Sequence, residues 1–307
     1  MGELPLFSPR RPLGKTGFAV TRVGIGDLAD RSIPIEQCVS TLRRALDAGL
    51  NIVDTAPSYE DGYSEQIVGR ALAGRRQGVF LIDKVDHLDR PVLPQVAESL
   101  ERLGTNSVDL FVFHGVSSLA AYRELMAKGG GWDQLEACRA AGHCRFVGLS
   151  SHHPGVLKEA IEAGRSDVLM FPVGPFVDAR YVDEILPLTR ERGIGSVCFK
   201  TFGAGKLLGD TEGYGRELSL RPRGKLSSGG TDQAEPTLPR LGVEECVRYT
   251  LTLDPDVALL GMSFPNEQDA ALSAAANFKP LSAAELDAVR SRASEAIRDK
   301  GPCWWNP

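Results

Sequence analysis

Short runs of apolar and β-branched residues alternate with longer amphipathic stretches along most of the chain. The runs span residues 20–26, 51–55, 79–84, 108–114, 145–150, 167–173, 195–200 and 257–262. Their mostly continuous apolar character is typical of strands that are buried on both faces. The amphipathic stretches predict helices at 34–49, 65–74, 93–104, 154–164, 181–193, 242–253 and 266–277. A longer helical segment, broken by three glycines at 129–131, precedes the fifth run.

Eight strand-then-helix units predict an α/β fold, a closed (β/α)8 TIM barrel that forms a single domain over residues 1–307. An open doubly wound sheet is the competing architecture. Gly24, Gly26 and Ala29 fit the G-x-G-x-x-A pattern of a dinucleotide-binding turn, but that fingerprint needs a helix opening at the glycines. Here the helix signal begins only at Pro34, so we favour the barrel.

Two segments fall outside the eight units. Residues 207–240, after the seventh strand, are rich in Gly, Pro and charge, and a loop of this length is usually functional or disordered. Either a lid over a bound ligand or a flexible insertion fits this composition. Ser282 and Glu285 form a capping-box pattern, which predicts an extra C-terminal helix over residues 282–299.

Composition and charge exclude several classes of partner and site. The net charge is −5 with no basic block, which argues against nucleic-acid and membrane-binding surfaces. The six cysteines form no CxxC pair, so neither a zinc nor an iron–sulfur site is expected, and we expect no metal. The chain shows no signal peptide or membrane span, which favours a cytoplasmic protein with reduced thiols. The oligomeric state stays open.

Polar groups able to share or move a proton stand at three consecutive strand ends. Asp54 lies near the end of the second strand, Lys84 ends the third and His114 ends the fourth, while Tyr59 follows in the loop after Asp54. Each residue alone has an ordinary structural explanation, such as a helix cap or a core histidine. Catalytic groups of a barrel come from the C-terminal ends of several strands, so the four together indicate an active site.

The segment around Tyr59 resembles the signature of the aldo-keto reductase family. DTAPSYEDGYSE runs from Asp54 to Glu65 and matches the family's Asp, its Tyr five residues later and its G-x-S-E element, after a short insertion of Glu60 and Asp61. LGKTG near the start, VDLFVFH and GLSS extend the resemblance over nearly the whole chain. It implies an NAD(P)(H)-dependent oxidoreductase that interconverts a carbonyl, such as an aldehyde, ketone or sugar, and an alcohol by hydride transfer.

The resemblance also implies a role for each catalytic candidate. Tyr59 would donate a proton to a carbonyl oxygen or accept one from an alcohol. A free tyrosine has a pKa of about 10, so a nearby Lys84 ammonium would lower it. Asp54 would hold Lys84 in place, and His114 would donate a hydrogen bond to the substrate oxygen.

Cofactor contacts are likewise implied by the resemblance. Phe199 would stack on the nicotinamide, and Ser150 and Ser151 would bind the carboxamide, although Ser151 replaces the usual Asn and Met170 stands where many members carry a Gln. The full set of implied cofactor residues is Gly26, Asp54, Ser150, Ser151, Met170, Phe199, Lys200, Phe202, Gly203, Gly205, Gly261, Ser263 and Gln268.

The segment that would bind adenosine lacks the expected cations. Met262, Gln268 and Leu272 stand where relatives supply charged or amide groups. NADP needs a cationic partner for its extra phosphate, so the sequence favours NAD or dual use. Two rival functions stay open: a cofactor-binding regulatory subunit without significant turnover, and a redox-neutral epimerase that retains its nicotinamide. For the oxidoreductase, the expected partner is a small carbonyl or alcohol substrate.

Overall fold

The computed structural model of the protein describes residues 10–27, 29–31, 33–208, 239–262, 265–298 and 300–307. Eight strands form one closed barrel in the order β10-β3-β4-β5-β6-β7-β8-β9, and every neighbouring pair is parallel. The barrel strands are β3 (Val23–Ile25), β4 (Ile52–Asp54), β5 (Phe80–Val85), β6 (Val108–Phe113), β7 (Cys144–Ser150), β8 (Val168–Pro172), β9 (Gly195–Phe199) and β10 (Val257–Leu260). The predicted TIM barrel is therefore confirmed.

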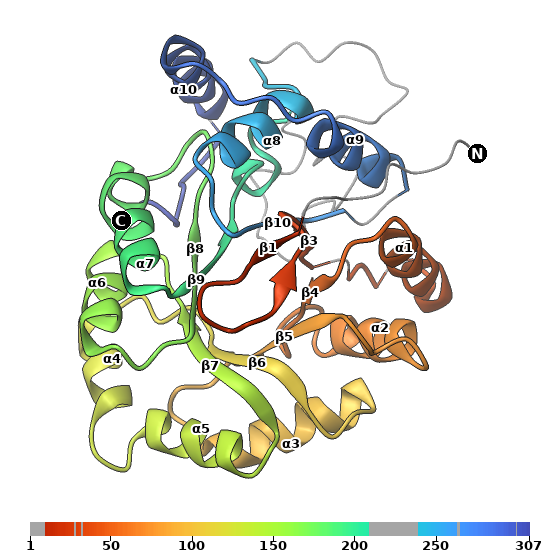
Figure 1. The fold of residues 1–307 in the computed structure, drawn as a ribbon, viewed down its shortest axis with the longest axis vertical. Coiled ribbons are helices and arrows are strands. Elements are labelled where there is room, and N and C mark those ends of the chain that lie inside the picture. The colour runs from red at the N-terminus through yellow and green to blue at the C-terminus, as the bar shows by residue number, and fades with distance from the viewer. Residues whose placement is uncertain (1–9, 28, 32, 209–238, 263–264, 299) are drawn as a thin grey trace.

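Helices surround this barrel, as Figure 1 shows. They are α1 (Ile35–Asp47), α2 (Tyr63–Leu72), α3 (Val92–Leu103), α4 (Leu119–Met126), α5 (Gly131–Ala140), α6 (Pro154–Ala163), α7 (Leu186–Arg192), α8 (Val243–Thr252), α9 (Pro265–Ala276) and α10 (Ala283–Ile297). The helix predicted at 181–193 begins with a π-helical turn, η1 (Tyr181–Ile185). Helix α10 lies beside α8 and begins at the predicted capping box, in which Ser282 and Glu285 bond each other's backbone N–H. Most of the predicted 207–240 loop lies outside the described residues.

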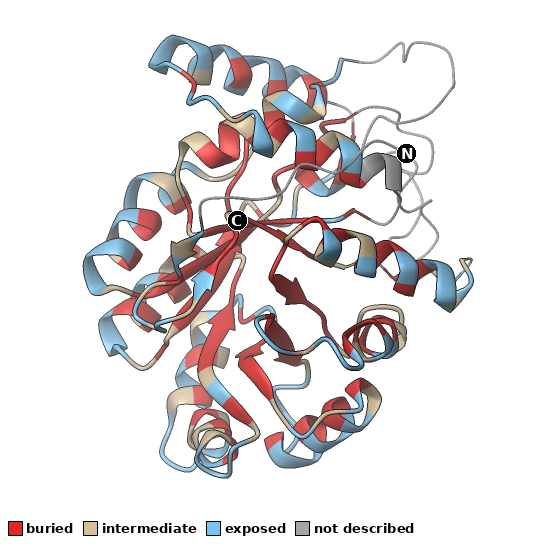
Figure 2. Ribbon diagram, turned by 45° about the vertical axis from the view of Figure 1, so that its right-hand side comes forward, coloured by how far each residue is buried: buried red, intermediate tan, exposed pale blue. Residues whose placement is uncertain are grey.

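The two-residue period of the strands divides the barrel wall into an inner and an outer face. Phe80 and Ile82 of β5 join a core cluster inside the barrel, whereas Leu81 and Val85 join the cluster between strands and helices. Lys84 keeps the inward parity of Ile82, at the C-terminal end of the strand. The barrel strands are mostly buried, with Arg145 of β7 an exposed exception, and the helices present exposed residues outward, as Figure 2 shows.

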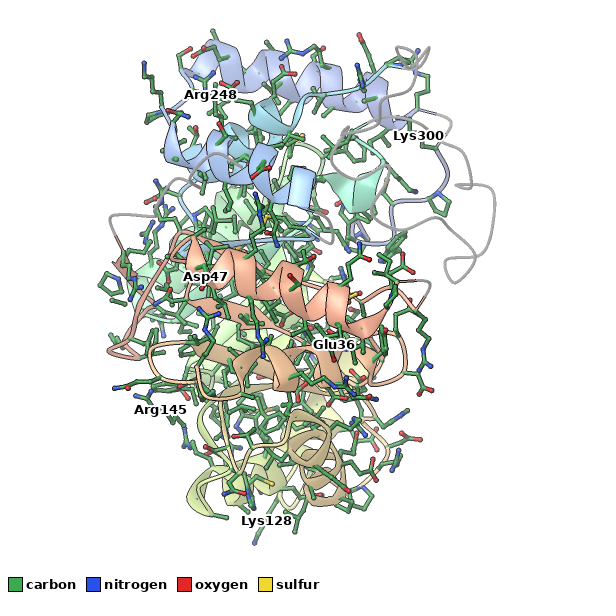
Figure 3. All side chains as sticks on the ribbon, turned by 90° about the vertical axis from the view of Figure 1, so that its right-hand side faces the viewer. Glu36, Asp47, Lys128, Arg145, Arg248 and Lys300 are labelled. Atoms are coloured by element: carbon green, nitrogen blue, oxygen red, sulfur yellow. The ribbon has the colours of Figure 1, made fainter. Side chains whose placement is uncertain are left out.

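Charged residues of the helices lie on the outer surface. Figure 3 shows Glu36 and Asp47 at opposite ends of α1. Glu36 pairs with Arg70 of α2 at 2.8 Å, and Asp47 pairs with Arg75 just beyond that helix. Exposed pairs of this kind contribute about 0–1 kcal/mol each, so the buried apolar faces of α1 and α2 hold the two helices in place.

A short hairpin closes the N-terminal end of the barrel, and the sequence analysis missed it. Strands β1 (Arg11–Pro12) and β2 (Ala19–Val20) pair antiparallel, so the single strand expected at 20–26 is wrong in its first residues. Leu13 and Val20 are fully buried within the inner cluster, and Phe18 meets Phe80 edge-on at 5.2 Å. Two-residue strands are too short to carry a periodic signal, which explains the omission.

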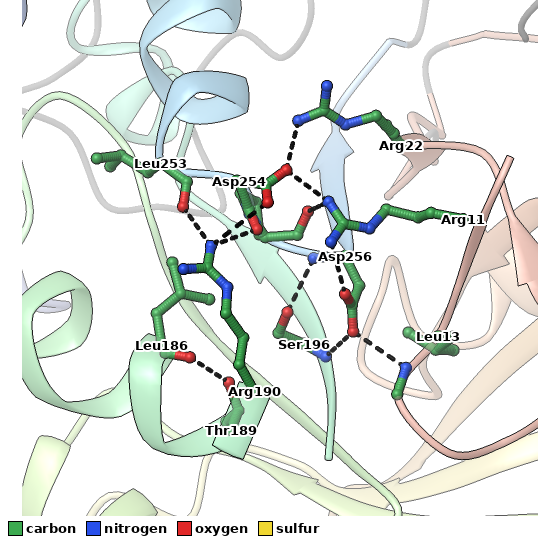
Figure 4. Close-up of polar contacts among 12 residues, drawn as sticks. Arg11, Leu13, Arg22, Leu186, Thr189, Arg190, Ser196, Leu253, Asp254 and Asp256 are labelled. Atoms are coloured by element: carbon green, nitrogen blue, oxygen red, sulfur yellow. Dashed lines mark hydrogen bonds and ion pairs between the residues drawn. The ribbon is translucent and has the colours of Figure 1, made fainter. Parts of the chain in front are cut away.

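An ion-pair network fastens this hairpin to the strands that it covers (Figure 4). Asp254 accepts hydrogen bonds from Arg11 at 2.6 Å and from Arg22 at 2.9 Å. Asp256 accepts the backbone N–H groups of Gly14 at 3.1 Å and Ser196 at 3.0 Å. This end of the barrel lies opposite the candidate catalytic residues, and its polar groups act in stability.

Shortening a buried side chain of the hairpin should lower the stability of the protein without affecting the candidate catalytic residues. Leu13→Ala removes a fully buried side chain from the inner cluster and should lower the free energy of unfolding by about 3 kcal/mol. Urea unfolding of the variant and the wild type measures this loss. A difference below about 1 kcal/mol would mean that the hairpin contributes little to the closed barrel.

Candidate active site

Asp54 and Lys84 form a buried ion pair at the C-terminal ends of β4 and β5. The Lys84 ammonium lies 2.7 Å from Oδ1 and 2.8 Å from Oδ2 of Asp54, and 2.7 Å from the carbonyl oxygen of Thr55. The Lys84 side chain is 2% exposed and that of Asp54 is 3% exposed, so the pair is almost completely shielded from water. The three ammonium protons thus have three acceptors, and the lysine is held rigidly.

Tyr59 packs over this ion pair from the loop after β4. The Lys84 ammonium lies 4.3 Å from the centroid of the Tyr59 ring, and the His114 ring meets that ring edge-on at 5.7 Å. All four predicted catalytic residues therefore gather at one end of the barrel. They are Asp54, Tyr59, Lys84 and His114.

The loop that carries Tyr59 is held in an unusual backbone conformation. Glu60 and Asp61, the residues inserted into the family signature, both have positive φ, at 51° and 54°. Arg31 donates hydrogen bonds to the Glu60 carbonyl oxygen at 2.7 and 2.9 Å, and to that of Asp61 at 3.1 Å. Non-glycine residues rarely adopt positive φ, and these contacts support the insertion in that conformation beside Tyr59.

Other residues of the signature serve the fold. Glu65 is fully buried and pairs with Arg102, which ties α2 to α3. Ser64 accepts a hydrogen bond from the Thr55 hydroxyl at 2.8 Å, which links the start of α2 to the end of β4. The Ser and Glu of the G-x-S-E element therefore anchor the two ends of the Tyr59 loop to the fold.

Burial controls the ionisation of these groups. It raises the pKa of Tyr59 above the usual value for a phenol, and the opposing effect of Lys84 is the smaller of the two. Burial also raises the pKa of Asp54 against the pull of Lys84. For Lys84, burial lowers the pKa, but Asp54 and Tyr59 together outweigh it, so the net direction is upward. Lys84 lowers the pKa of Tyr59, as expected. The net change in the pKa of Tyr59 is nevertheless upward, which is the reverse of the expectation.

Asp86 is a site residue that the sequence analysis missed. Its Oδ1 contacts Nδ1 of His114, and its Oδ2 accepts the backbone N–H of Ser58 at 2.6 Å. Burial would raise the pKa of Asp86, but the hydrogen bonds from His114 and Ser58 outweigh it and hold the pKa below its usual range. The sequence offered one signal for Asp86: it lies two residues after Lys84, just beyond the end of a strand.

Ser150 and Ser151 join neighbouring loops at the end of β7. The Ser150 hydroxyl accepts the N–H of Gly115 at 2.9 Å, and the Ser151 hydroxyl accepts the N–H of His153 at 3.0 Å. Met170 lies on β8 inside the barrel wall. The two serines and Met170 therefore occupy the rim and the wall beside His114.

The segment after β9 combines aromatic rings, a lysine and a tight turn. Lys200 has a φ of 77°, and Gly203 and Gly205 have φ of 55° and 85° within the short turn η2 (Gly203–Gly205). The Lys200 ammonium lies 5.2–5.6 Å from the ring centroids of Phe199, Trp304 and Trp305. Burial lowers the pKa of Lys200 to about 8. The turn itself, Gly203–Gly205, carries little side-chain bulk because it consists of two glycines and Ala204.

His152 lies beside Phe199, with ring centroids 5.2 Å apart. Its Nε2 is buried and has no hydrogen-bond partner among the described residues. Burial, together with the charges of Lys200 and His114, lowers the pKa of His152 to about 3, so this ring is neutral. A buried polar atom without a partner at the rim is available to a bound molecule.

The remaining predicted cofactor positions divide into two groups. Gly26 and Gly261 are neighbours at the ends of β3 and β10, where the Gly26 N–H donates to the Leu260 carbonyl oxygen at 2.9 Å. Gln268 is fully buried, and its amide nitrogen donates to the Thr41 carbonyl oxygen at 2.8 Å. Gln268 therefore packs α9 against α1, and its amide nitrogen is engaged within the fold. Ser263 lies outside the described residues.

Searches for metal-binding clusters and membrane spans give simple results. The described residues contain no group of three or more His, Cys, Asp or Glu side chains arranged to hold a metal ion. Within the same part of the chain, no helix has both the length and the apolar character needed to cross a bilayer. All six cysteines fall in described segments and are unpaired.

Comparison with known proteins assigns the family. The sequence model of the aldo/keto reductase family matches residues 22–292. The uncharacterized oxidoreductase YqkF of Bacillus subtilis is 26% identical, over 94% of this chain and 97% of its own. The NADH-specific methylglyoxal reductase of Escherichia coli is 28% identical, over 81% of this chain and 83% of its own.

A solved structure extends the match to the fold. The holo form of the aldo-keto reductase AKR11C1 from Bacillus halodurans superposes with a TM-score of 0.69 and 25% identity, over 94% of this chain and 96% of its own. Because the family match spans most of the barrel and the signature residues meet at its C-terminal end, this chain belongs to the aldo/keto reductase family and is an NAD(P)-dependent carbonyl reductase or dehydrogenase.

Proposed function

We propose that this enzyme interconverts small polar aldehydes or ketones and their alcohols, with Tyr59 as the group that gives or takes the proton. The observation that carries this proposal is the convergence of Tyr59, His114 and the buried Asp54–Lys84 pair at one end of the barrel. Relatives named a methylglyoxal reductase, an L-galactose dehydrogenase and a D-threo-aldose 1-dehydrogenase support a small oxygen-rich substrate.

The nicotinamide cofactor, when bound, supplies the hydride. The chain's own residues then handle the oxygen atom of the substrate. The Tyr59 hydroxyl donates its proton to the carbonyl oxygen during reduction, and the Lys84 ammonium, 4.3 Å from the ring, stabilises the phenolate left behind. Asp54 keeps the ammonium charged and in place, and His114 orients the substrate oxygen through a hydrogen bond.

The residues that fit a dinucleotide line the rim from β7 round to β3. Phe199 offers a ring face for the nicotinamide. Met170 lies on the adjacent strand β8, and Ser150 and Ser151 lie at the end of β7, one strand further round. The turn at Lys200, Phe202, Gly203 and Gly205 would hold the pyrophosphate, with Gly26 and Gly261 leaving room beyond it. Asp54, at the end of β4, would complete the set.

A steady-state assay tests this proposal directly. Purified enzyme is mixed with NADH or NADPH and a panel of methylglyoxal, simple aldehydes and aldoses, and the oxidation direction is run with the matching alcohols and sugars. We expect turnover with at least one small polar carbonyl compound. Cofactor binding without turnover across the panel would favour a regulatory role, and a nicotinamide that never exchanges would favour an epimerase.

A binding titration tests the cofactor preference. Neither Met262, which is buried, nor Gln268, whose amide is engaged by Thr41, offers a cation to a 2′-phosphate. We therefore expect NADH to bind at least as tightly as NADPH, as measured by quenching of protein fluorescence. A clear preference for NADPH would contradict this expectation and would point to a cation elsewhere, with Arg221, Arg223 and Lys225 of the 207–240 segment as the first to mutate.

A further inference from the structure

Asp86 joins two elements of the site through one carboxylate. Oδ1 contacts Nδ1 of His114, while Oδ2 accepts the N–H of Ser58, the residue before Tyr59. Asp86 is 8% exposed and His114 is 25% exposed, so the carboxylate lies behind the ring and the rest of the imidazole is open. The contact with Asp86 occupies one ring nitrogen and leaves Nε2 for a ligand.

An ionised carboxylate accepts hydrogen bonds and cannot donate them, so Nδ1 of His114 must carry a proton. This contact excludes the neutral tautomer whose single proton sits on Nε2. Nε2 is then a donor only when the ring carries two protons, and an acceptor when it carries one. The ability of His114 to hydrogen-bond a carbonyl oxygen is therefore tied to its charge.

We propose that Asp86 is a positioning residue that fixes the tautomer of His114 and so makes reduction depend on the protonation of that ring. This inference rests on the proposed function. Doubly protonated His114 donates from Nε2 to a carbonyl oxygen and favours reduction. Singly protonated His114 presents only a lone pair at Nε2 and cannot donate to that oxygen, and the hydroxyl proton of an alcohol substrate goes to Tyr59.

Other titratable groups surround His114 without contacting its nitrogens. They are Asp54 on β4, Tyr59 in the loop after β4, Lys84 on β5 and His152 after β7. Asp54 is paired with Lys84, Tyr59 meets the ring edge-on, and His152 is neutral. Within the described part of the chain, Asp86 is thus the charged group in direct contact with the ring.

Asp86→Asn should invert the tautomer, because Ser58 dictates how the new amide is oriented. The Ser58 N–H needs an acceptor, so the amide oxygen takes the place of Oδ2 and the NH2 group faces Nδ1 of His114. Nδ1 must then accept, and the neutral ring carries its proton on Nε2. His114 becomes a donor toward the substrate even when it is uncharged.

The kinetic test compares pH profiles of kcat/KM for reduction, with methylglyoxal as the first carbonyl probe. In the wild type, kcat/KM should fall roughly 10- to 100-fold as the His114 ring loses its second proton. In Asp86→Asn, kcat/KM should lose this dependence. Asp89→Asn, an exposed residue of the same loop, makes the same charge change and should keep the wild-type profile. Asp86→Glu should retain the wild-type pH dependence.

A spectroscopic test needs no turnover. Long-range proton–nitrogen NMR reports the tautomer of each of the five histidines, and the His114 signals are those lost in His114→Gln. In the neutral ring, the wild type should carry the proton on Nδ1 and Asp86→Asn should carry it on Nε2. The same tautomer in both proteins, or a wild-type proton on Nε2, would overturn the proposal. Absence of turnover in the wild type would instead count against the proposed function alone.

Discussion

Tyr59→Phe should lose about a hundred- to ten-thousand-fold in turnover while it keeps its affinity for the nicotinamide cofactor. The phenol hydroxyl acts mainly in the transition state, so its removal lowers kcat and kcat/KM together. The ring remains, and with it the edge-on contact with His114 and the contact with the Lys84 ammonium. Steady-state kinetics and a cofactor titration on the same preparation measure both quantities.

Tyr63→Phe is the matched control for this experiment. Tyr63 lies four residues further on, and its hydroxyl donates to the Ile33 carbonyl oxygen at 2.9 Å. Loss of that hydrogen bond should cost about 1 kcal/mol of stability and leave turnover near the wild-type value. If Tyr59→Phe stays active and Tyr63→Phe does not, the proton donor has been assigned to the wrong tyrosine.

Lys84→Met should lower the free energy of unfolding by about 3–5 kcal/mol, because it leaves the Asp54 carboxylate buried without its partner. Asp54→Leu alone should cost a similar amount, since it strands the ammonium beside the Thr55 carbonyl oxygen. The double variant replaces the whole pair with apolar groups, which is often close to neutral in stability. Its unfolding midpoint should therefore lie nearer the wild type than either single variant does.

Turnover separates the structural and chemical roles of this pair. The double variant should regain stability but remain inactive, because no ammonium is left beside Tyr59 to stabilise the phenolate. Urea unfolding followed by circular dichroism gives the stability, and the assay with the best carbonyl probe gives the activity. If the double variant is as unstable as the single variants, contacts between the pair and its surroundings also stabilise the fold, in addition to the contact between Asp54 and Lys84.

The alternation of strand and helix patterns was sufficient to predict the barrel. Each strand is short, continuous and apolar, and each is followed by a helix-length amphipathic stretch, so the length of the apolar run and the helical period of the stretch after it together distinguish the elements. The same pattern located Asp54, Lys84 and His114 at strand ends, and parallel strands bring such ends together at one face. Tyr59 needed the family signature as well, because it lies in a loop with no period of its own.

Several features depend on contacts that leave no periodic trace. The two-residue strands of the hairpin are defined by their pairing with each other and by Leu13 and Val20 inside the barrel. Gln268 matched a cofactor position by alignment, yet its side chain is buried against α1 through the Thr41 carbonyl oxygen. Whether a polar side chain faces a ligand or a neighbouring helix depends on packing between residues more than two hundred positions apart.

The sequence by itself determined the order of the elements, the barrel and the four residues at its catalytic end, because these depend on local periodicity and on a motif read in one stretch. Only the tertiary structure decided the state of those residues. The pKa of Tyr59 is raised because burial outweighs Lys84, and the tautomer of His114 depends on Asp86, which follows a different strand. Desolvation and hydrogen-bond partnership are properties of a residue's surroundings in space, and neighbours along the chain do not specify them.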